Sequence, residues 1–217
     1  MKTRNQQTGI EYRAYTLPGL TVRRDGDRPV ITGYAAVFNE LSVMLWSFRE
    51  EILKGAFAES IEKNDVRALY QHETNQVLGR TKNGSLRLWE DDKGLSFELE
   101  PADTTIGRDA VTSIERGDVD QMSFGFRSLP DGDEWRFSED ETLIRTLKKV
   151  DLLEVSPVTW AAYPQTSVGV RSLPNFESLP EWVQRALTQQ PVDDSAEAAR
   201  ARLDLMRRRL RVASLEI

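Results

Sequence analysis

The sequence predicts an α+β fold in which short strands outnumber helices. Several short segments alternate apolar and polar residues, which is the period of a strand with one buried face. Polar clusters such as Arg24-Asp25-Gly26-Asp27 separate these segments and indicate turns. Only a few segments place apolar residues three or four positions apart, as helices do. The length of 217 residues favours one main domain with an appendage.

The individual elements follow from these patterns. Two strands joined by the turn at 24–27 are predicted within 11–38, and a loop is predicted over 39–53. Further strands are predicted over 66–72, 85–89, 95–99, 121–127 and 143–155. Helices are predicted over 54–64 and 104–116. In the second helix, Asp103 or Thr104 is expected as the cap, and Gly117 stands where a C-terminal glycine belongs.

The composition changes towards the C-terminus. We expect a flexible N-terminus over 1–10, a main domain over 11–171, a linker over 172–193 and a basic amphipathic helix over 194–217. A short helix is also predicted within the linker, over 181–187. In the terminal helix, Leu203, Met206 and Leu210 form an apolar stripe, and Asp194 with Glu197 resembles a capping box.

Composition and charge exclude several classes of function. The net charge of −6 argues against a general nucleic-acid coat, and no run of about 18 apolar residues predicts a membrane span. The chain has no cysteine, which excludes disulfides, thiolate nucleophiles and Cys-ligated zinc. A single histidine excludes the usual metal site of two or three histidines. We expect no metal and no cofactor. A base that titrates near neutral pH is therefore His72, or else a strongly perturbed carboxylate or lysine.

Ser123 is the candidate nucleophile. In the segment QMSFGF (121–126), the large apolar residues fall on one strand face, and Gln121, Ser123 and Gly125 fall on the other. We expect that second face to be polar and uncrowded, so that a peptide backbone can approach the hydroxyl, as nucleophilic attack requires. An ordinary strand with one face in solvent explains the same pattern.

His72 and Glu154 are the candidate partners of this serine. His72 is predicted at the end of a strand, in line with Val66, Ala68 and Tyr70, where a polar turn follows. Glu154 stands between Leu153 and Val155, and a carboxylate buried there would be stabilised by a protonated imidazole. Asp151 competes for this role, but it has the opposite strand parity. A histidine that only bonds a loop, and a glutamate that only faces solvent, are the alternatives.

Other side chains allow other chemistry. Lys148 or Lys149 would be needed for a serine–lysine dyad, although lysines usually lie on the surface. Glu98 and Glu100 would be the paired carboxylates of a different hydrolase, although any exposed strand face shows the same alternation. Arg80 and Arg127 are candidates for structural ion pairs or for substrate contacts.

An ordered set of short motifs resembles the prohead proteases (capsid maturation proteases) of tailed bacteriophages, which are related in fold to the herpesvirus assemblins. The resemblance runs from about residue 12 to residue 171. The motifs are GYAAVFN (33–39), KGAF (54–57), QHE (71–73), VLGR (77–80), QMSFGF (121–126), LEVSPV (153–158) and AYP (162–164). The set is specific because it keeps its order across most of the chain.

The resemblance implies a serine endopeptidase in which Ser123 is the nucleophile, His72 the base and Glu154 the third member. Assemblins use a second histidine as the third member, so here an acid serves or the site is a dyad. The implied fold is a mainly antiparallel, β-barrel-like core surrounded by a few helices, like that of the assemblins, with a C-terminal helical tail. Oxyanion donors are expected from the loop at roughly 160–166.

The resemblance also implies a place and a partner. The enzyme would work in the host bacterial cytoplasm, inside the immature capsid, on the major capsid protein or its scaffold segment and on itself. The terminal helix would dock scaffold or capsid subunits, form a self-cleaved end, pack on its own domain, or join copies in a homodimer or higher oligomer. A non-catalytic assembly factor that keeps the fold is the alternative function.

Overall fold

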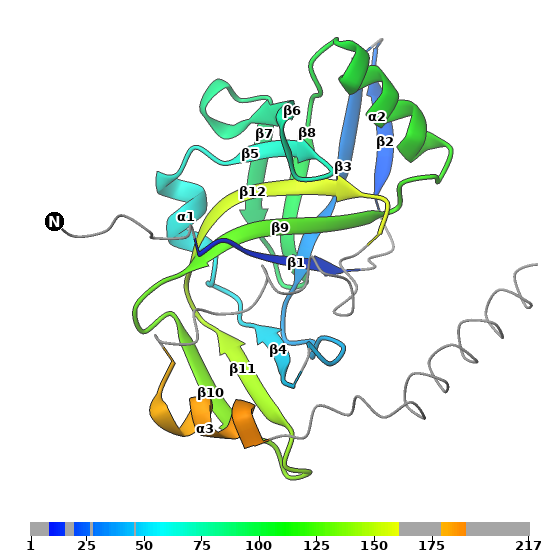
Figure 1. Ribbon diagram of the computed structural model, residues 1–217. Helices are drawn as coiled ribbons and strands as arrows, with labels where there is room; N and C mark the ends of the chain where they lie inside the picture. The colour runs from blue at the N-terminus through cyan, green and yellow to red at the C-terminus, as the bar shows by residue number, and fades with distance from the viewer. Residues whose placement is uncertain (1–8, 16–19, 27, 46, 161–178, 190–217) are drawn as a thin grey trace, which may run out of the picture.

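Three β-sheets and three α-helices make up the described part of the chain in the computed structural model, which covers residues 9–15, 20–26, 28–45, 47–160 and 179–189 (Figure 1). The five-stranded sheet has the order β1 (Glu11–Tyr15), β9 (Gln121–Ser128), β12 (Val150–Val158), β5 (Arg67–Tyr70) and β6 (Glu73–Arg80). The four-stranded sheet has the order β2 (Thr21–Asp25), β3 (Arg28–Val37), β8 (Gly94–Leu99) and β7 (Leu86–Glu90). The three-stranded sheet has the order β10 (Asp133–Phe137), β11 (Leu143–Leu147) and β4 (Arg49–Ile52).

The helices are few and short, as the sequence predicts. They are α1 (Ala58–Lys63), α2 (Thr105–Glu115) and α3 (Glu181–Gln189). Thr104 caps α2, because its hydroxyl accepts a hydrogen bond from the backbone N–H of Gly107 at 3.1 Å. Gly117 follows this helix with a φ of 77°, the left-handed conformation that favours glycine. The α+β class and both ends of this helix are thus confirmed.

The barrel-like core is not found in the described residues. Their strands form three open sheets, and no sheet closes on itself. The pairing is mainly antiparallel, as predicted, but β12 runs parallel to β5 and β11 runs parallel to β4. The predicted strand over 143–155 is in fact two strands in different sheets. Lys148 and Lys149 separate the two strands, and their backbone N–H groups both donate to the carbonyl of Gly132.

One hydrophobic core joins the five-stranded and four-stranded sheets. Phe124, Phe126 and Leu152 come from the first sheet, and Ile31 and Phe97 from the second, and all five are almost completely buried. Burying large apolar side chains in this way is the main stabilising contribution to such a fold. It also fixes which face of β9 points away from the core, and this is the face that carries Ser123.

A second, smaller core holds α3 against the three-stranded sheet. Phe48, Trp135 and Leu143 from the sheet region pack with Leu179 and Val183, which lie just before and within the helix. The predicted helix over 181–187 is therefore present, and it packs on the rest of the protein. The terminal helix predicted over 194–217 lies outside the described residues.

A buried group of charges connects β1 to the three-stranded sheet. Arg145 on β11 donates to Glu11 at 2.6 Å and to Glu50 at 3.1 Å, and its side chain is 0% exposed. Arg13 donates to the same two carboxylates, at 2.8 Å and 2.6 Å. Burial alone would lower the pKa of Arg145, but Glu11 and Glu50 beside it raise that pKa above its usual value. These ion pairs anchor β1 at the edge of the five-stranded sheet.

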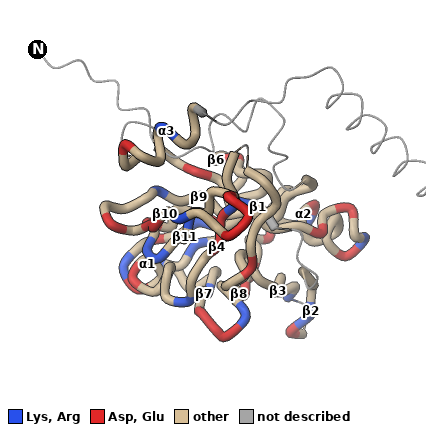
Figure 2. The backbone as a smooth tube through the Cα atoms, turned by 90° about the horizontal axis from the view of Figure 1, so that it is seen from below, with Lys and Arg blue, Asp and Glu red and all other residues tan. Residues whose placement is uncertain are grey.

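Charges on the surface are mixed in sign. Figure 2 shows acidic and basic residues interspersed along the described backbone, seen from below. Within the described residues, no helix is both long enough and apolar enough to span a membrane.

Candidate functional site

All three predicted site residues belong to the five-stranded sheet or to one of its turns. Ser123 lies on β9, Glu154 on the neighbouring β12, and His72 in the turn between β5 and β6. The sheet order therefore places the three residues around β9, β12 and β5 although they are far apart in the chain.

A β-bulge in β12 aims Glu154 at the site. Leu152 pairs with Phe126, but Glu154 pairs with Gly125, so the register shifts by one residue between them. With regular alternation, Glu154 would share the core face with Leu152. The extra residue turns Glu154 to the opposite face, which is the usual effect of a bulge next to a functional site. Glu154 is 6% exposed in this position.

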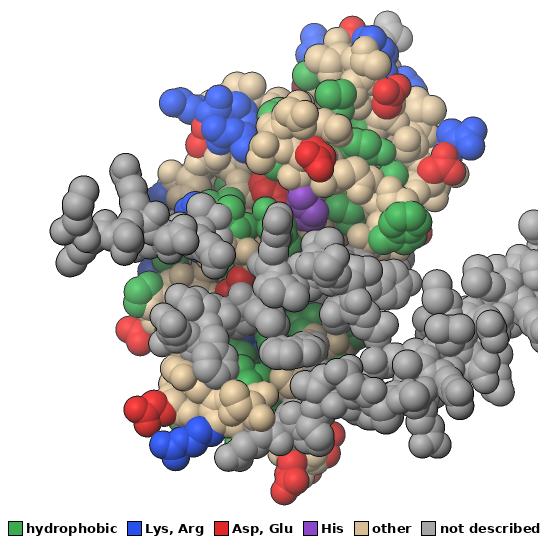
Figure 3. All heavy atoms as spheres, viewed as in Figure 1, with side chains coloured by type: hydrophobic (Ala, Val, Ile, Leu, Met, Phe, Trp, Pro, Cys, Tyr) green, Lys and Arg blue, Asp and Glu red, His purple; other side chains and the backbone are tan. Residues whose placement is uncertain are grey.

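His72 contacts Glu154 directly. The Nδ1 atom of the imidazole lies 2.7 Å from Oε1 of the carboxylate. Because an ionised carboxylate only accepts hydrogen bonds, this contact requires a proton on Nδ1, and a neutral imidazole then has its lone pair on Nε2. The His72 side chain is 25% exposed, and the histidine, purple in Figure 3, reaches the surface on this face. This arrangement suits a base that is both held and accessible.

The sequence pattern predicted His72 at the end of a strand, but the residue lies in a two-residue turn. β5 ends at Tyr70, which pairs with Glu73, so Gln71 and His72 form the tip of the hairpin. Both have left-handed φ angles, 56° and 61°. Because His72 lies in this turn, the direction of its side chain does not follow the alternation of β5, and the imidazole reaches Glu154 on the neighbouring strand β12.

Gly125 and Tyr12 form the surroundings of the His72–Glu154 pair. A Cβ atom on Gly125 would lie 2.6 Å from Oε1 of Glu154 and 3.0 Å from Cε1 of Tyr12, so only glycine leaves room for both. Tyr12 pairs with Gly125 across β1 and β9, and its ring packs edge-on against the imidazole with 4.6 Å between the centroids. Ser156 donates a hydrogen bond to Oε2, the other oxygen of Glu154.

Ser123 lies on the same face of the sheet, one row further along. It pairs with Ala14 on β1 and with Ser156 on β12, whereas Gly125 pairs with Tyr12 and Glu154. Two residues on one strand face are about 6.5 Å apart along the strand. The hydroxyl of Ser123 and the His72–Glu154 pair therefore belong to adjacent rows on one side of β9.

The expected uncrowded face around Ser123 is wrong. Ser123 is 0% exposed, and its Oγ donates a hydrogen bond to the backbone carbonyl of Arg13 at 2.9 Å. The neighbouring strand β1 pairs with β9 at this point, with Ala14 opposite Ser123, and it brings the Arg13 carbonyl within hydrogen-bonding distance of the hydroxyl. In this structure the hydrogen-bond acceptor of the serine is thus the carbonyl of a neighbouring strand, and not the imidazole.

The other sequence candidates have structural partners of their own. Asp151 accepts from Asn64 at 2.7 Å and lies 3.4 Å from Arg127. Its parity does not exclude it, because the bulge places Asp151 and Glu154 on the same face, but these partners occupy it. The other candidates form ion pairs: Arg80 with Asp65, Glu98 with Arg23 and Arg87, Lys148 with Glu134, and Lys149 with Glu59. Glu100 lies just beyond the end of β8 and is exposed.

Sequence reasoning missed Tyr12, Ser156 and the carbonyl of Arg13. The LEVSPV motif contains Ser156, two residues after Glu154, and this i, i+2 spacing was the available signal for a shared strand face. No signal in the sequence indicated that β1 pairs with β9, more than a hundred residues away. The oxyanion loop predicted at roughly 160–166 falls outside the described residues from 161 onwards.

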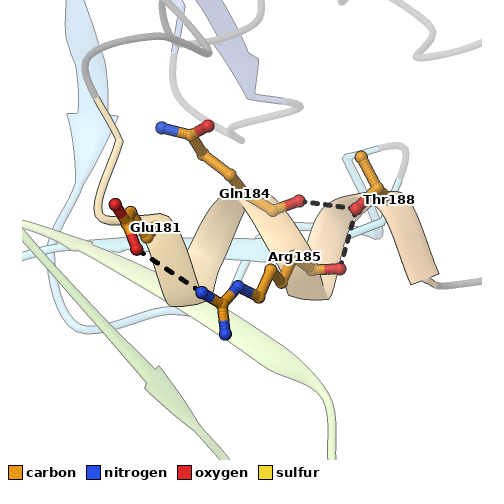
Figure 4. A pocket seen from close by; sticks show the side chains of 4 residues that line it. All are labelled: Glu181, Gln184, Arg185 and Thr188. Carbon is orange, nitrogen blue, oxygen red and sulfur yellow. Dashed lines mark hydrogen bonds and ion pairs between the residues drawn. The ribbon is translucent and has the colours of Figure 1, made fainter.

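A hollow along α3 offers no comparable chemistry. It is lined by Glu181, Gln184, Arg185 and Thr188 (Figure 4). Glu181 and Arg185 form an exposed ion pair, and the hydroxyl of Thr188 donates to backbone carbonyls of its own helix. Within the described residues, no group of three or more His, Cys, Asp or Glu side chains is placed to hold a metal ion.

Comparisons with known proteins give one matching family and a similar solved structure. The family model described as Caudovirus prohead serine protease matches residues 19–178. A structure of the bacteriophage T4 capsid assembly protease, gp21, is similar with a TM-score of 0.45 and 12% identity, over 70% of this chain and 98% of that one. No curated protein matches the sequence.

Proposed function

Because the chain belongs to the Caudovirus prohead serine protease family, we propose that it is a serine endopeptidase that cleaves scaffold or capsid-subunit segments during prohead maturation. The observation that carries this proposal is the 2.7 Å contact between His72 and Glu154, on the same sheet face as Ser123. All three residues fall within the segment that the family model matches.

The proposed reaction follows from this geometry. Glu154 accepts from Nδ1–H of His72 and so keeps the lone pair on Nε2, where a base for Ser123 is needed. Rotation of the Ser123 side chain moves its hydroxyl from the Arg13 carbonyl towards the imidazole in the adjacent row. His72 then takes the proton as Oγ attacks the scissile carbonyl, and it returns this proton to the leaving amine. Water completes the cycle by hydrolysing the acyl-enzyme.

The biological setting is part of the same proposal. The substrate is the major capsid protein or its scaffold segment, and the enzyme also cleaves itself. The site of action is the interior of the prohead in the host bacterial cytoplasm. The family assignment supports this setting.

A serine-directed probe tests the chemistry without knowledge of the substrate. In the reaction with a fluorophosphonate, Oγ of the serine bonds to phosphorus, fluoride leaves, and His72 takes the proton. Mass spectrometry of the labelled peptide is expected to find the adduct on Ser123, and Ser123→Ala is expected to abolish it. His72→Ala is expected to slow labelling strongly, because residues that act as a unit lose on the order of 10⁶-fold in rate when one is removed.

Cleavage of the natural partner is the second part of the test. Wild type, Ser123→Ala and His72→Ala would each be co-expressed with the capsid subunit, and the subunit mass would be measured. Trimming by wild type alone supports the endopeptidase. Equal trimming by all three proteins would end the proposal.

A non-catalytic assembly factor is the second candidate function. It is favoured by one observation, the buried Ser123 hydroxyl that donates to the Arg13 carbonyl. In that case the probe would label neither wild type nor His72→Ala, and Ser123→Ala would leave capsid assembly and scaffold removal intact.

A further inference from the structure

The turn that carries His72 has an unusual backbone for its residues. A two-residue hairpin with positive φ at both central positions normally contains Asn-Gly or Asp-Gly, because glycine has no Cβ to clash in this conformation. Here the two positions are Gln71 and His72, with φ angles of 56° and 61°. Such strained residues persist only where surrounding contacts hold them.

Gln71 supplies these contacts. Its backbone N–H donates to the carbonyl of Pro157 at 3.1 Å. Its side-chain Nε2 donates to Oγ1 of Thr159 at 2.7 Å, and its Oε1 accepts from the backbone N–H of Thr159 at 3.2 Å. We call the two hydrogen bonds between the side chain of Gln71 and Thr159 the Gln71–Thr159 latch.

The latch connects the turn that carries His72 to the end of the strand that carries Glu154. Pro157 lies on β12 three residues after Glu154, and Thr159 directly follows that strand. The strand that carries the carboxylate therefore also holds the turn that carries the imidazole. A shift of the turn would change the 2.7 Å contact between Nδ1 and Oε1 directly.

We propose that Gln71 and Thr159 are positioning residues, which hold the strained turn so that Nδ1 of His72 stays on Glu154 and Nε2 stays free for Ser123. The role in catalysis rests on the proposed function, whereas the role in holding the imidazole does not. In this role the two residues act through His72 and not on the reacting atoms themselves.

Thr159→Val is the direct test, with Thr159→Ser as its matched control. Valine keeps the size of threonine but removes the oxygen that accepts from Gln71, whereas serine keeps that oxygen. The first readout is the rate at which a fluorophosphonate labels Ser123. Thr159→Val is expected to be slower by on the order of ten- to a hundredfold, since small misplacements of catalytic groups have effects of this size. Thr159→Ser is expected to stay close to wild type.

The second readout is independent of activity. Since His72 is the only histidine, its two ring nitrogens give the only imidazole signals in a ¹⁵N spectrum. Wild type and Thr159→Ser are expected to show one tautomer, protonated at Nδ1. Thr159→Val is expected to show a mixture of tautomers and faster exchange of the Nδ1 proton with water. A purely structural threonine would change the melting temperature and leave these signals as they are.

Gln71→Gly separates positioning from folding. Glycine adopts the left-handed conformation freely, so this variant is expected to keep the melting temperature of wild type while it loses the latch. Labelling of Ser123 is expected to slow as in Thr159→Val. Wild-type labelling and wild-type ¹⁵N signals in either variant would overturn the latch. If wild type itself does not react with the probe but the ¹⁵N signals still change in the variants, the latch stands and the proposed function falls.

Discussion

The hydroxyl of Ser156 donates to Oε2 of Glu154 and thereby leaves Oε1 to the imidazole of His72. The carboxylate is thus fixed at both oxygens by side chains from two different parts of the sheet. Ser156 is completely buried, so water does not replace its hydroxyl easily. A carboxylate held in this way presents one fixed oxygen to the imidazole.

Ser156→Ala is predicted to lower kcat about tenfold and to leave KM nearly unchanged. Hydrogen bonds to charged groups contribute about 1.5–3 kcal/mol, and about 1.4 kcal/mol corresponds to a factor of ten in rate. Steady-state kinetics on a capsid-subunit peptide would measure the effect. Ser96→Ala is the control, because Ser96 is also nearly buried, and within the described residues its hydroxyl donates only to the Gly33 carbonyl, at 3.5 Å. Equal kinetics in the two variants would mean that Ser156 does not orient Glu154.

Gly125→Ala is predicted to displace the His72–Glu154 pair. Its new Cβ would lie 2.6 Å from Oε1 of Glu154, which is closer than side-chain atoms approach one another. We expect a fall in kcat on the order of a hundredfold, with a loss of about 1–3 kcal/mol in the free energy of unfolding from overpacking. Chemical denaturation and kinetics would be measured on the same sample.

The control for this variant is Gly9→Ala, because nothing lies within 4 Å of a Cβ at Gly9. Both substitutions add one methyl group and change the backbone freedom in the same direction. A Gly125→Ala protein with wild-type kcat would show that Glu154 can move aside without loss of function.

The sequence predicted most of the elements that depend on local patterns. α2 was located within one residue at each end, because its cap, its apolar face and its terminal glycine are all local signals. β4, β6 and β10 were missed, and the two strands predicted within 11–38 are in fact three, β1, β2 and β3, of which β1 belongs to a different sheet. β4 and β10 pair with β11, and their sequences carry little alternation of their own. Short strands of this kind form through pairing with distant strands more than through local preference.

The sequence proposed Ser123, His72 and Glu154 as the candidate site, but it did not predict the geometry in which they lie. The pairing of His72 with Glu154 depends on two local departures from strand alternation, the left-handed turn at Gln71 and the bulge before Glu154. An argument from strand alternation cannot predict these two departures. The turn takes His72 out of the strand, and the bulge inserts one extra residue before Glu154. The hydrogen bond from Ser123 to the Arg13 carbonyl depends on the pairing of β1 with β9, which nothing in the local sequence indicates.

Arg145→Met is predicted to destabilise the protein strongly without a direct effect on the site residues. The variant leaves Glu11 and Glu50 with one cation, Arg13, where they now have two. Removing one partner from a buried ion pair typically costs about 3–5 kcal/mol. Arg116→Met is the control, because the ion pair of Arg116 with Asp118 is exposed. If both variants unfold at the same denaturant concentration, the buried charges do not stabilise the attachment of β1.

The same charges predict how stability depends on pH. Burial by itself would raise the pKa of Glu11, but the guanidinium groups of Arg145 and Arg13 outweigh it and hold that pKa below its usual value. A carboxyl whose pKa is lower in the folded than in the unfolded state binds fewer protons when folded. Its contribution is therefore complete above the unfolded pKa of about 4.3 and is lost as the pH falls through the folded pKa.

Denaturant unfolding between pH 7 and pH 3 would measure this dependence. In wild type, the contribution of Glu11 to the free energy of unfolding is expected to stay constant from pH 7 down to about pH 4.3. Below about pH 4.3 this contribution is expected to decrease. Glu11→Gln is expected to be less stable at pH 7 but to lose less between pH 4.3 and pH 3, because it has no carboxyl to protonate at this position. Glu139→Gln, at an exposed carboxylate, should run parallel to wild type. Parallel curves for wild type and Glu11→Gln would mean that Glu11 does not contribute to the acid lability of the fold.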